Sequence, residues 1–260
     1  MDYKSAAAQL KETMRLKTEP FGVSFFKDPA GLPAKTRQPS KVFGKKVTIC
    51  QGVTMTRVYG WPVGLTQDDL ICIPGMLVFG FTPATDPIME LGQLFCETGF
   101  HRDLGPALKE VAALPRFEPR EVGAIYLCPL ARLALDPDVV VVYGNPAQLM
   151  RLIQAATFSL GERVTGEFGG KVECSEYLIA PYRTGQIRVA IPGMGDRIFS
   201  MTQDDEMVVA FPGKFLEGLL VGLEDAGKKI GARYPVTFYQ NFSPSFPSPY
   251  EERAKKWGII

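Results

Sequence analysis

The sequence predicts an α/β fold, because runs of β-branched residues alternate with stretches of helical periodicity. The clearest strand lies in the segment PDVVVVYG, where residues 139–142 are four valines, as a strand buried on both faces requires. A helix is predicted directly after it, over residues 146–158, where Leu149, Leu152 and Ala156 recur at helical spacing. We therefore expect a mixed sheet with flanking helices, and a mixed α+β arrangement is the alternative.

The other elements follow from the same patterns in chain order. Residues 4–17 form an amphipathic helix, and PFGVSFF is a strand because β-branched and aromatic residues dominate it. KVTICQGVTMTRVYG fits either a helix or a strand, and GPALKEVAALP is a helix ended by Pro115. VGAIYLCPL and EMVVAFPG are strands, RTGQIRVAIPG contains a short strand, and KFLEGLLVGLEDAGKKI is a helix that ends near Gly231.

Composition limits the class of protein. The chain has 260 residues, 46% of them hydrophobic, which is enough to bury a large core in one domain, residues 1–260. Its 29 Lys and Arg balance its 28 Asp and Glu, so no nucleic-acid or acidic-membrane partner is expected. The polar N-terminus lacks the apolar core of a signal peptide, and no stretch approaches the roughly 18 apolar residues of a membrane span. We expect a cytoplasmic protein.

An internal similarity indicates two related halves within that domain. LTQDDLICIPG, residues 65–75, parallels MTQDDEMVVAFPG, residues 201–213, and each is expected to end in an apolar strand followed by Pro-Gly. The similarity divides the chain into half-units of about 18–120 and 121–231. The tail, residues 232–260, is aromatic and rich in proline, so it is expected to wrap over the body or over a neighbouring subunit of a homo-oligomer.

The turn GNPAQ between the predicted strand and helix has two interpretations. Asn145 fits the N-cap position, Pro146 the first helical position, and Gln148 lies three residues beyond the cap, as in a capping box. These residues either cap the helix only, or Asn145 and Gln148 also bind a carboxylate or phosphate. The second interpretation follows because helix starts favour anions and open sheets bind ligands at the carboxyl ends of their strands.

A second glycine-containing turn is another candidate anion site. In IPGMGDR, Gly193 and Gly195 can present backbone N–H groups to an anion, and Arg197 can bind a carboxylate through two hydrogen bonds. The alternative is a hairpin turn with a surface pair formed by Asp196 and Arg197. Arg183, expected in a loop, is either a further anion ligand or an exposed side chain.

The five cysteines do not form a local metal-binding pattern. An odd number of cysteines without a signal peptide argues against a disulfide scaffold, and no CxxC pair is present. The simplest interpretation is that most of them are small buried apolar residues. They are Cys50, Cys72, Cys96, Cys128 and Cys174.

The segments PDVVVVYGNPAQLMRLIQA, GGKVECSEYLIAPY, IPGMGDR and DDEMVVAFPG resemble the archaeal and bacterial family called domain of unknown function 169. The resemblance extends from about Leu10 to Glu224. It implies no particular reaction, but members often carry cysteines that match Cys50, Cys72 and Cys174, and a fourth where this chain has Gly193. Four such thiols imply an iron–sulfur cluster or another soft metal. This chain departs from the pattern at the fourth position.

Three functions remain open at this point. The first is an enzyme for a small anionic organic substrate, such as a carboxylate, acyl or aromatic compound, whose reaction the sequence does not specify. Its cavity would join the GNPAQ turn and the Gly193–Arg197 turn to Cys174, whose thiol would have a lowered pKa; Cys174 and Arg197 are the catalytic candidates. The second is a redox or sensory protein with a metal or iron–sulfur cluster on Cys50, Cys72 and Cys174. The third is a non-catalytic module for a small ligand.

Overall fold

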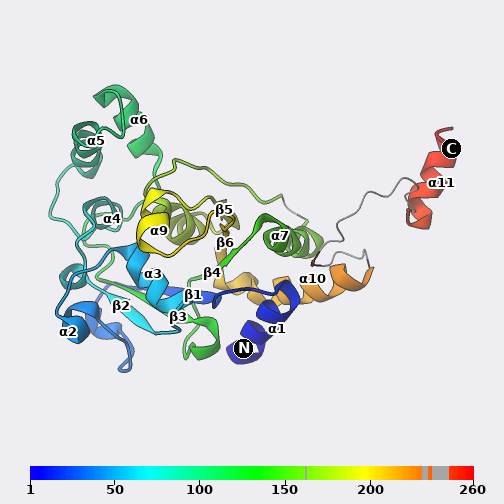
Figure 1. Ribbon diagram of the computed structural model, residues 1–260, viewed down its shortest axis with the longest axis horizontal. Coiled ribbons are helices and arrows are strands. Elements are labelled where there is room, and N and C mark those ends of the chain that lie inside the picture. Colours follow the sequence, from blue (N-terminus) through cyan, green and yellow to red (C-terminus); the bar gives the residue numbers. More distant parts are fainter. Residues whose placement is uncertain (162, 230–233, 236–245) are drawn as a thin grey trace.

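A six-stranded sheet forms the centre of the protein, and the computed structural model describes residues 1–161, 163–229, 234–235 and 246–260 (Figure 1). The α/β class is thereby confirmed. Every pairing of neighbouring strands is antiparallel, which corrects the expected mixed sheet: β3 and β4 run in the same direction, but β1 lies between them. In sheet order the strands are β2 (Val63–Leu65), β3 (Ala124–Pro129), β1 (Phe21–Phe26), β4 (Val139–Gly144), β6 (Met207–Pro212) and β5 (Arg188–Ala190).

Helices cover both faces of this sheet, as expected for strands that are apolar throughout. The first half contributes α1 (Tyr3–Met14), α2 (Pro39–Phe43), α3 (Ile49–Arg57), α4 (Ile73–Val78), α5 (Pro87–Glu97) and α6 (Leu104–Ala113). The second half contributes α7 (Pro146–Leu160), a π-helix (Ser175–Ile179), α8 (Ala180–Thr184), α9 (Met194–Phe199), α10 (Leu216–Lys229) and α11 (Ser248–Lys256).

Strand β4 separates the two hydrophobic cores. Val139 and Val141 face the core formed with α3, α4, α5 and α6, whereas Val140 and Val142 face the core formed with α1, α7 and α10. All four valines are completely buried, so the strand predicted to be buried on both faces is confirmed. Alternation of side chains along the strand explains why neighbouring valines enter different cores.

The start of α7 is the predicted capping box. The side chain of Asn145 accepts a hydrogen bond from the backbone N–H of Gln148 (2.9 Å), and the side chain of Gln148 accepts one from the N–H of Asn145 (2.8 Å). Pro146 occupies the first turn, and Gly161 ends the helix in a left-handed conformation. The helix predicted over residues 146–158 is therefore confirmed, with its end at Leu160.

The two TQDD segments differ in structure. The first follows β2 and is itself followed by α4, because Ile73 and Pro74 begin a helix where a strand was expected. The second leads into strand β6. In addition, β3 from the second predicted half-unit lies between β1 and β2 of the first. The predicted equivalence of the two segments is therefore wrong, and the two half-units share one interleaved sheet.

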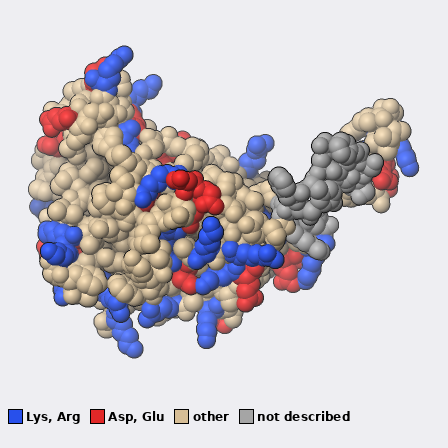
Figure 2. Space-filling model, in the orientation of Figure 1, with Lys and Arg blue, Asp and Glu red and all other residues tan. Residues whose placement is uncertain are grey.

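The C-terminal helix α11 lies apart from the rest of the described chain (Figure 1). None of its residues is buried, and Tyr250 and Trp257 are exposed. The tail therefore does not wrap over the body at these residues; packing on a neighbouring subunit stays a prediction, and residues 236–245 lie outside the described part. No helix in the described residues is both long and apolar enough for a membrane span. Acidic and basic side chains intermix on the face shown in Figure 2.

Candidate functional site

Two unusual backbone features flank the segment that contains Cys174. Val172 adopts a left-handed conformation with φ of 60°, which is strained for a β-branched residue. Three residues later, at Ser175, the chain enters the π-helix, a form that occurs frequently at functional sites. Strain of this kind persists only where the surrounding structure imposes it, which indicates a functional site. The consequence is that Glu173, Cys174 and Glu176 are all buried.

Asp196 lies at the centre of a buried polar region beneath α9. Its side chain is completely buried, and its two oxygens accept hydrogen bonds from the hydroxyls of Tyr177 (3.1 Å) and Tyr143 (3.3 Å). The thiol of Cys50 donates a further hydrogen bond to it. Burial raises the pKa of Asp196 although these donors oppose the shift. The expected surface pair of Asp196 and Arg197 is therefore wrong.

Three thiols and the carboxyl group of Glu173 come together around Asp196. This thiol–carboxyl cluster consists of Cys50, Cys72, Cys174, Glu173 and Asp196. Burial raises the pKa of Cys174 well above its ordinary value, and the charges of Cys72, Asp196 and Glu173 raise it further. Burial followed by the charge of Asp196 has the same effect on the pKa of Cys50. The predicted lowered pKa of Cys174 is therefore wrong, because the thiol is buried and its charged neighbours are another thiol and two carboxyl groups in place of arginines.

Glu173 lies in the space that a side chain at position 193 would take. The backbone N–H of Gly193 donates to the Glu173 carboxyl group, and a β-carbon at position 193 would overlap its oxygen Oε1. That oxygen has no hydrogen-bond partner, although only 2% of the residue is exposed. Burial, with smaller contributions from Asp196 and Glu176, raises the pKa of Glu173 to about 8. This chain thus has Gly193 at the position where the resemblance implies a fourth cysteine, and the side chain of Glu173 fills the space beside it.

The donor set of the thiol–carboxyl cluster suits a metal chemically, but its present arrangement does not form a metal site. Thiolates bind soft metals, and a carboxylate can complete such a ligand set. However, no three Cys, His, Asp or Glu side chains in the described parts of the chain are placed to hold a metal ion.

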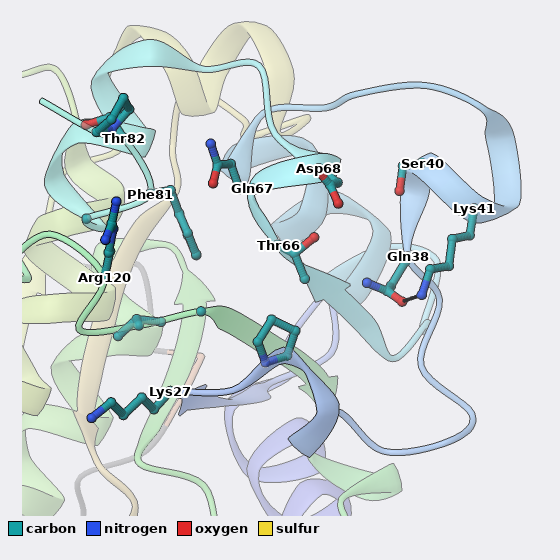
Figure 3. A pocket seen from close by; sticks show the side chains of 15 residues that line it. Lys27, Gln38, Ser40, Lys41, Thr66, Gln67, Asp68, Phe81, Thr82 and Arg120 are labelled. Carbon is teal, nitrogen blue, oxygen red and sulfur yellow. Dashed lines mark hydrogen bonds between the residues drawn. The ribbon is translucent and has the colours of Figure 1, made fainter.

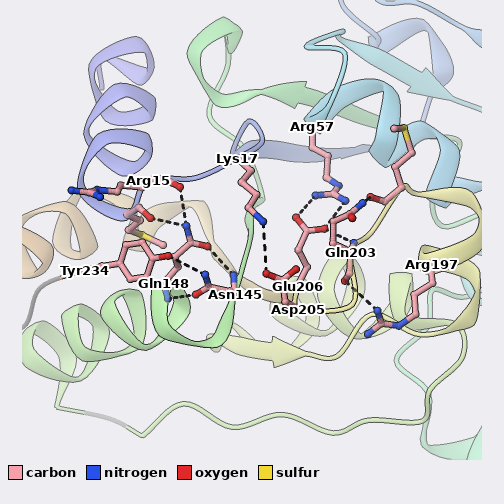
Figure 4. A network of polar contacts seen from close by, with 12 residues as sticks. Arg15, Lys17, Arg57, Asn145, Gln148, Arg197, Gln203, Asp205, Glu206 and Tyr234 are labelled. Carbon is pink, nitrogen blue, oxygen red and sulfur yellow. Dashed lines mark hydrogen bonds and ion pairs between the residues drawn. The ribbon is translucent and has the colours of Figure 1, made fainter. Parts of the chain in front are cut away.

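A buried ion pair lies beside the cluster. Arg57 on α3 donates two hydrogen bonds to Glu206, of 2.9 and 3.1 Å (Figure 4). Its guanidinium lies over the ring of Tyr143. Arg57 also donates to the backbone carbonyl of Ser200. This ion pair connects α3 to the segment before β6 and fixes the tyrosine that contacts Asp196.

The amide groups of the GNPAQ turn bind other parts of the protein. The side chain of Gln148 donates to the carbonyls of Met14 and Arg15 at the end of α1, and Asn145 donates to Tyr234. Figure 4 shows these residues at the opposite end of the network from Arg197. Structural hydrogen bonds therefore occupy the amide groups of this turn, and an anion could bind there only by displacing them.

Arg197 and the glycines near it have different roles from those expected. Gly193 is the N-cap of α9, and Gly195 approaches the thiol of Cys50, since a β-carbon there would lie 3.5 Å from Sγ. The segment is helical, which overturns the expected hairpin. Arg197 donates to the carbonyl of Gln203 and pairs with Asp204 at the surface. The thiols and the glycine turn therefore meet, whereas Arg197 points away from them.

A cavity of about 360 Å³ adjoins the thiol–carboxyl cluster through Glu176, and we call it the Glu176 cavity. Arg183 contributes to its wall from helix α8, where a loop was expected. This arginine pairs with Glu121 and lies over the ring of Phe117. Arg188 on β5 also lines the cavity, and its buried Nε has no hydrogen-bond partner. The apolar part of the wall comes from Ala113, Leu114, Pro115, Phe168, Ala180 and Val189.

Glu176 and Glu110 form a pair of carboxyl groups with different environments in this wall. The N–H of Gly169 donates to one oxygen of Glu176 (3.0 Å), and the other oxygen has no partner. Burial, aided by the charge of Glu110, raises the pKa of Glu176 to about 7. Glu110 pairs with Lys171 (2.9 Å) and with His101. Such a difference is typical of acid and base groups in active sites.

Sequence reasoning named the three thiols, Gly193 and Arg183 as candidates but did not name the buried acids near them. Glu173, Glu176 and Asp196 resemble ordinary surface residues in sequence. The segment KVECSEYLIAPY carried one usable signal, because it places two acids beside a cysteine in an otherwise apolar run. Nothing in the sequence indicated that Arg57 is buried, because the apolar pattern of its segment fitted a helix and a strand equally well.

Comparison with known proteins places the chain in a family. The model of the family of unknown function 169, described as uncharacterised ArCR, matches residues 9–222. An uncharacterised protein of the archaeon Methanocaldococcus jannaschii is 25% identical over 224 residues, which cover 86% of this chain and 94% of that protein. No solved structure gives a significant match. Because the family model covers most of its length, this chain belongs to the family of unknown function 169.

Proposed function

We propose that the protein is an enzyme that acts on a small organic carboxylate in the Glu176 cavity, with Glu176 as its acid–base group. The observation that carries the proposal is the partnerless oxygen of Glu176 in the wall of a cavity, with a pKa of about 7. A general acid or base is most effective when its pKa lies near the operating pH. The strained Val172 and the π-helix support the same location.

The walls of the Glu176 cavity fit an aromatic or acyl carboxylate. Its volume of about 360 Å³ lies in the range of small-ligand sites, and Phe168 and Leu114 provide apolar surface. The free Nε of Arg188 is a donor for the carboxylate of the substrate. Arg183 contributes positive charge from the same wall, although its guanidinium is shared with Glu121.

The chemistry we assign to Glu176 is proton transfer to or from the bound substrate. Lys171 and His101 pair with the carboxylate of Glu110, and the charge of Glu110 helps to keep a proton on Glu176. The carboxyl groups of Glu173 and Asp196 lie behind Glu176, and the charge of Asp196 acts in the same direction. We assign no nucleophilic role to Cys174, because its raised pKa keeps the thiol protonated near neutral pH.

The proposal is tested by binding and by conversion. Benzoate and hexanoate serve as probes in calorimetric titrations, and a panel of aromatic and acyl carboxylates is incubated in D₂O and followed by NMR. We expect binding by the parent protein, conversion or deuterium uptake for at least one compound, and loss of that reaction in Glu176→Gln. Glu97→Gln removes an exposed carboxylate elsewhere and should leave both measurements unchanged. Absence of binding would overturn the proposal, and binding without conversion would favour a non-catalytic module.

A second candidate function is a soft-metal or iron–sulfur protein. The observation that favours it is the partnerless oxygen of Glu173 within a group of three thiols. Binding would require Cys50, Cys72 and Cys174 to move toward one another and lose their protons. The test is anaerobic purification, followed by metal analysis and by measurement of the absorption at about 400 nm. Cys174→Ser should then remove the metal, whereas Cys96→Ser, outside the cluster, should retain it.

A further inference from the structure

A second cavity, of about 560 Å³, lies beside the core formed with α3, α4, α5 and α6, and we call it the Lys27 cavity (Figure 3). One wall is formed by the start of α2 with Ser40 and Lys41, and by the turn after β2 with Thr66 and Asp68. The opposite wall carries Lys27 and Arg120, which come from the segments after β1 and before β3. Basic side chains therefore belong to both walls of the cavity.

A buried aspartate holds the first wall in place. Asp69 is completely buried, and one of its oxygens accepts hydrogen bonds from the N–H (3.0 Å) and hydroxyl (2.6 Å) of Ser40. The other accepts from the N–H (3.0 Å) and hydroxyl (2.7 Å) of Thr66. These donors keep the pKa of Asp69 low although burial alone would raise it. The two segments of the wall are thus fixed to each other before any ligand binds.

The second wall contains a strained residue. Arg120 has φ of 64°, a left-handed conformation that costs free energy for any residue except glycine. Its backbone N–H donates to the carbonyl of Gly80, which is itself left-handed and has no room for a β-carbon because the carbonyl of Glu118 lies against it. An exposed arginine kept in a conformation suited to glycine indicates that its side chain has a role.

The Lys27 cavity carries an excess of positive charge. Lys27, Lys41 and Arg120 line it, and Asp68 is the one carboxylate among its lining residues. Among the residues that the structure describes, none of the three basic groups forms an ion pair. Three cations and one anion leave an excess of about two positive charges. This excess matches the negative charge of a phosphomonoester near neutral pH.

We propose that the Lys27 cavity binds a small phosphorylated molecule, with Lys27 and Arg120 as the main ligands of the phosphate. Lysine acts as a compact point charge and arginine as a bidentate hydrogen-bond donor, and both serve as phosphate ligands. The cavity is large enough for a phosphomonoester with a short polar carbon chain. This site is separate from the Glu176 cavity, because the two share no lining residue.

The test is calorimetric titration of the full chain at low ionic strength with glycerol 3-phosphate, glycerol and succinate. Glycerol 3-phosphate should bind, glycerol should not, and succinate should bind at least about tenfold more weakly, because its charge is divided between two carboxylates. Lys27→Ala and Arg120→Gly should each weaken the binding of glycerol 3-phosphate by about tenfold or more, the effect of losing a charged hydrogen bond. Lys46→Ala removes an exposed positive charge outside the cavity and should not change the affinity.

Thermal unfolding separates a binding role of Arg120 from a structural one. Glycine adopts the left-handed conformation freely, so Arg120→Gly should unfold at the same temperature as the parent or at a higher one. A protein that keeps its stability but loses affinity supports the proposal. Failure of glycerol 3-phosphate to bind, equal binding of succinate, unchanged affinity in both cavity variants, or an equal loss in Lys46→Ala would each overturn it.

Discussion

The carboxyl group of Glu173 occupies the space beside Gly193, accepts the N–H of that glycine, and would overlap any β-carbon placed there. The two positions therefore depend on each other: a glutamate at 173 in this orientation requires glycine at 193. The family resemblance implies a cysteine at position 193 in many relatives.

Gly193→Ala should destabilise the protein by about 1–3 kcal/mol, the usual cost of overpacking a buried site. Glu173→Ala in the same chain should recover part of that loss, because it removes the carboxyl group that the new methyl group meets. Recovery should be incomplete, since the backbone carbonyl of Gly170 also approaches position 193. Urea denaturation of the two single variants and the double variant measures the coupling free energy. Additive effects would contradict the dependence.

Stability should respond to the raised pKa values of the buried acids. Glu173 and Glu176 have folded-state pKa values of about 8 and about 7, against the ordinary value of 4.5 for a glutamate exposed to solvent in the unfolded chain. Between about pH 4.5 and these values the folded state binds more protons than the unfolded state, so their contribution to stability is lost as pH rises. Each group contributes a slope of at most about 1.4 kcal/mol per pH unit.

Glu173→Gln isolates the contribution of one group. Glutamine keeps the shape and cannot ionise, so the free energy of unfolding of the variant, relative to the parent, should increase from about pH 5 to about pH 8. Denaturant titrations at intervals across this range provide the measurement. The matched change Glu97→Gln at the surface should give a flat difference. A flat difference for Glu173→Gln as well would show that its carboxyl group ionises normally.

The buried pair of Arg57 and Glu206 should be far more sensitive to mutation than its exposed neighbour. Glu206→Ala leaves the Arg57 guanidinium buried without its carboxylate, which costs about 3–5 kcal/mol in comparable cases. Asp205→Ala breaks the exposed pair with Lys17, 3.7 Å apart, and should change stability little. The two adjacent substitutions are compared by thermal and chemical unfolding. Similar small losses would refute a structural role for the buried pair.

Asn145→Ala should cost about 1–2 kcal/mol, because the N–H of Gln148 loses its acceptor at the start of α7. Asn145→Asp keeps the acceptor and removes only the amide group that donates to Tyr234, so it should cost clearly less. Chemical denaturation ranks the three proteins. Equal costs for alanine and aspartate would assign the effect to the contact with Tyr234 and remove the cap from the explanation.

The sequence by itself determined the local elements. Four successive valines specify β4, and Asn145, Pro146 and Gln148 specify the start of α7, because these signals act through neighbouring backbone groups alone. The same reasoning predicted the apolar strands β1, β3 and β6. It gave the wrong structure for residues 73–78, where the apolar run suited both a strand and a helix that begins with a proline.

Only the tertiary structure decided which distant residues meet and what their charges become. The insertion of β1 between β3 and β4 makes the sheet antiparallel, and no local pattern specifies that order. The left-handed Val172 turns Glu173 and Cys174 inward, where burial raises both pKa values; the same residues at a surface with arginines would have had lower ones. A pKa depends on solvent exclusion and on charges from remote segments, so its direction follows from packing.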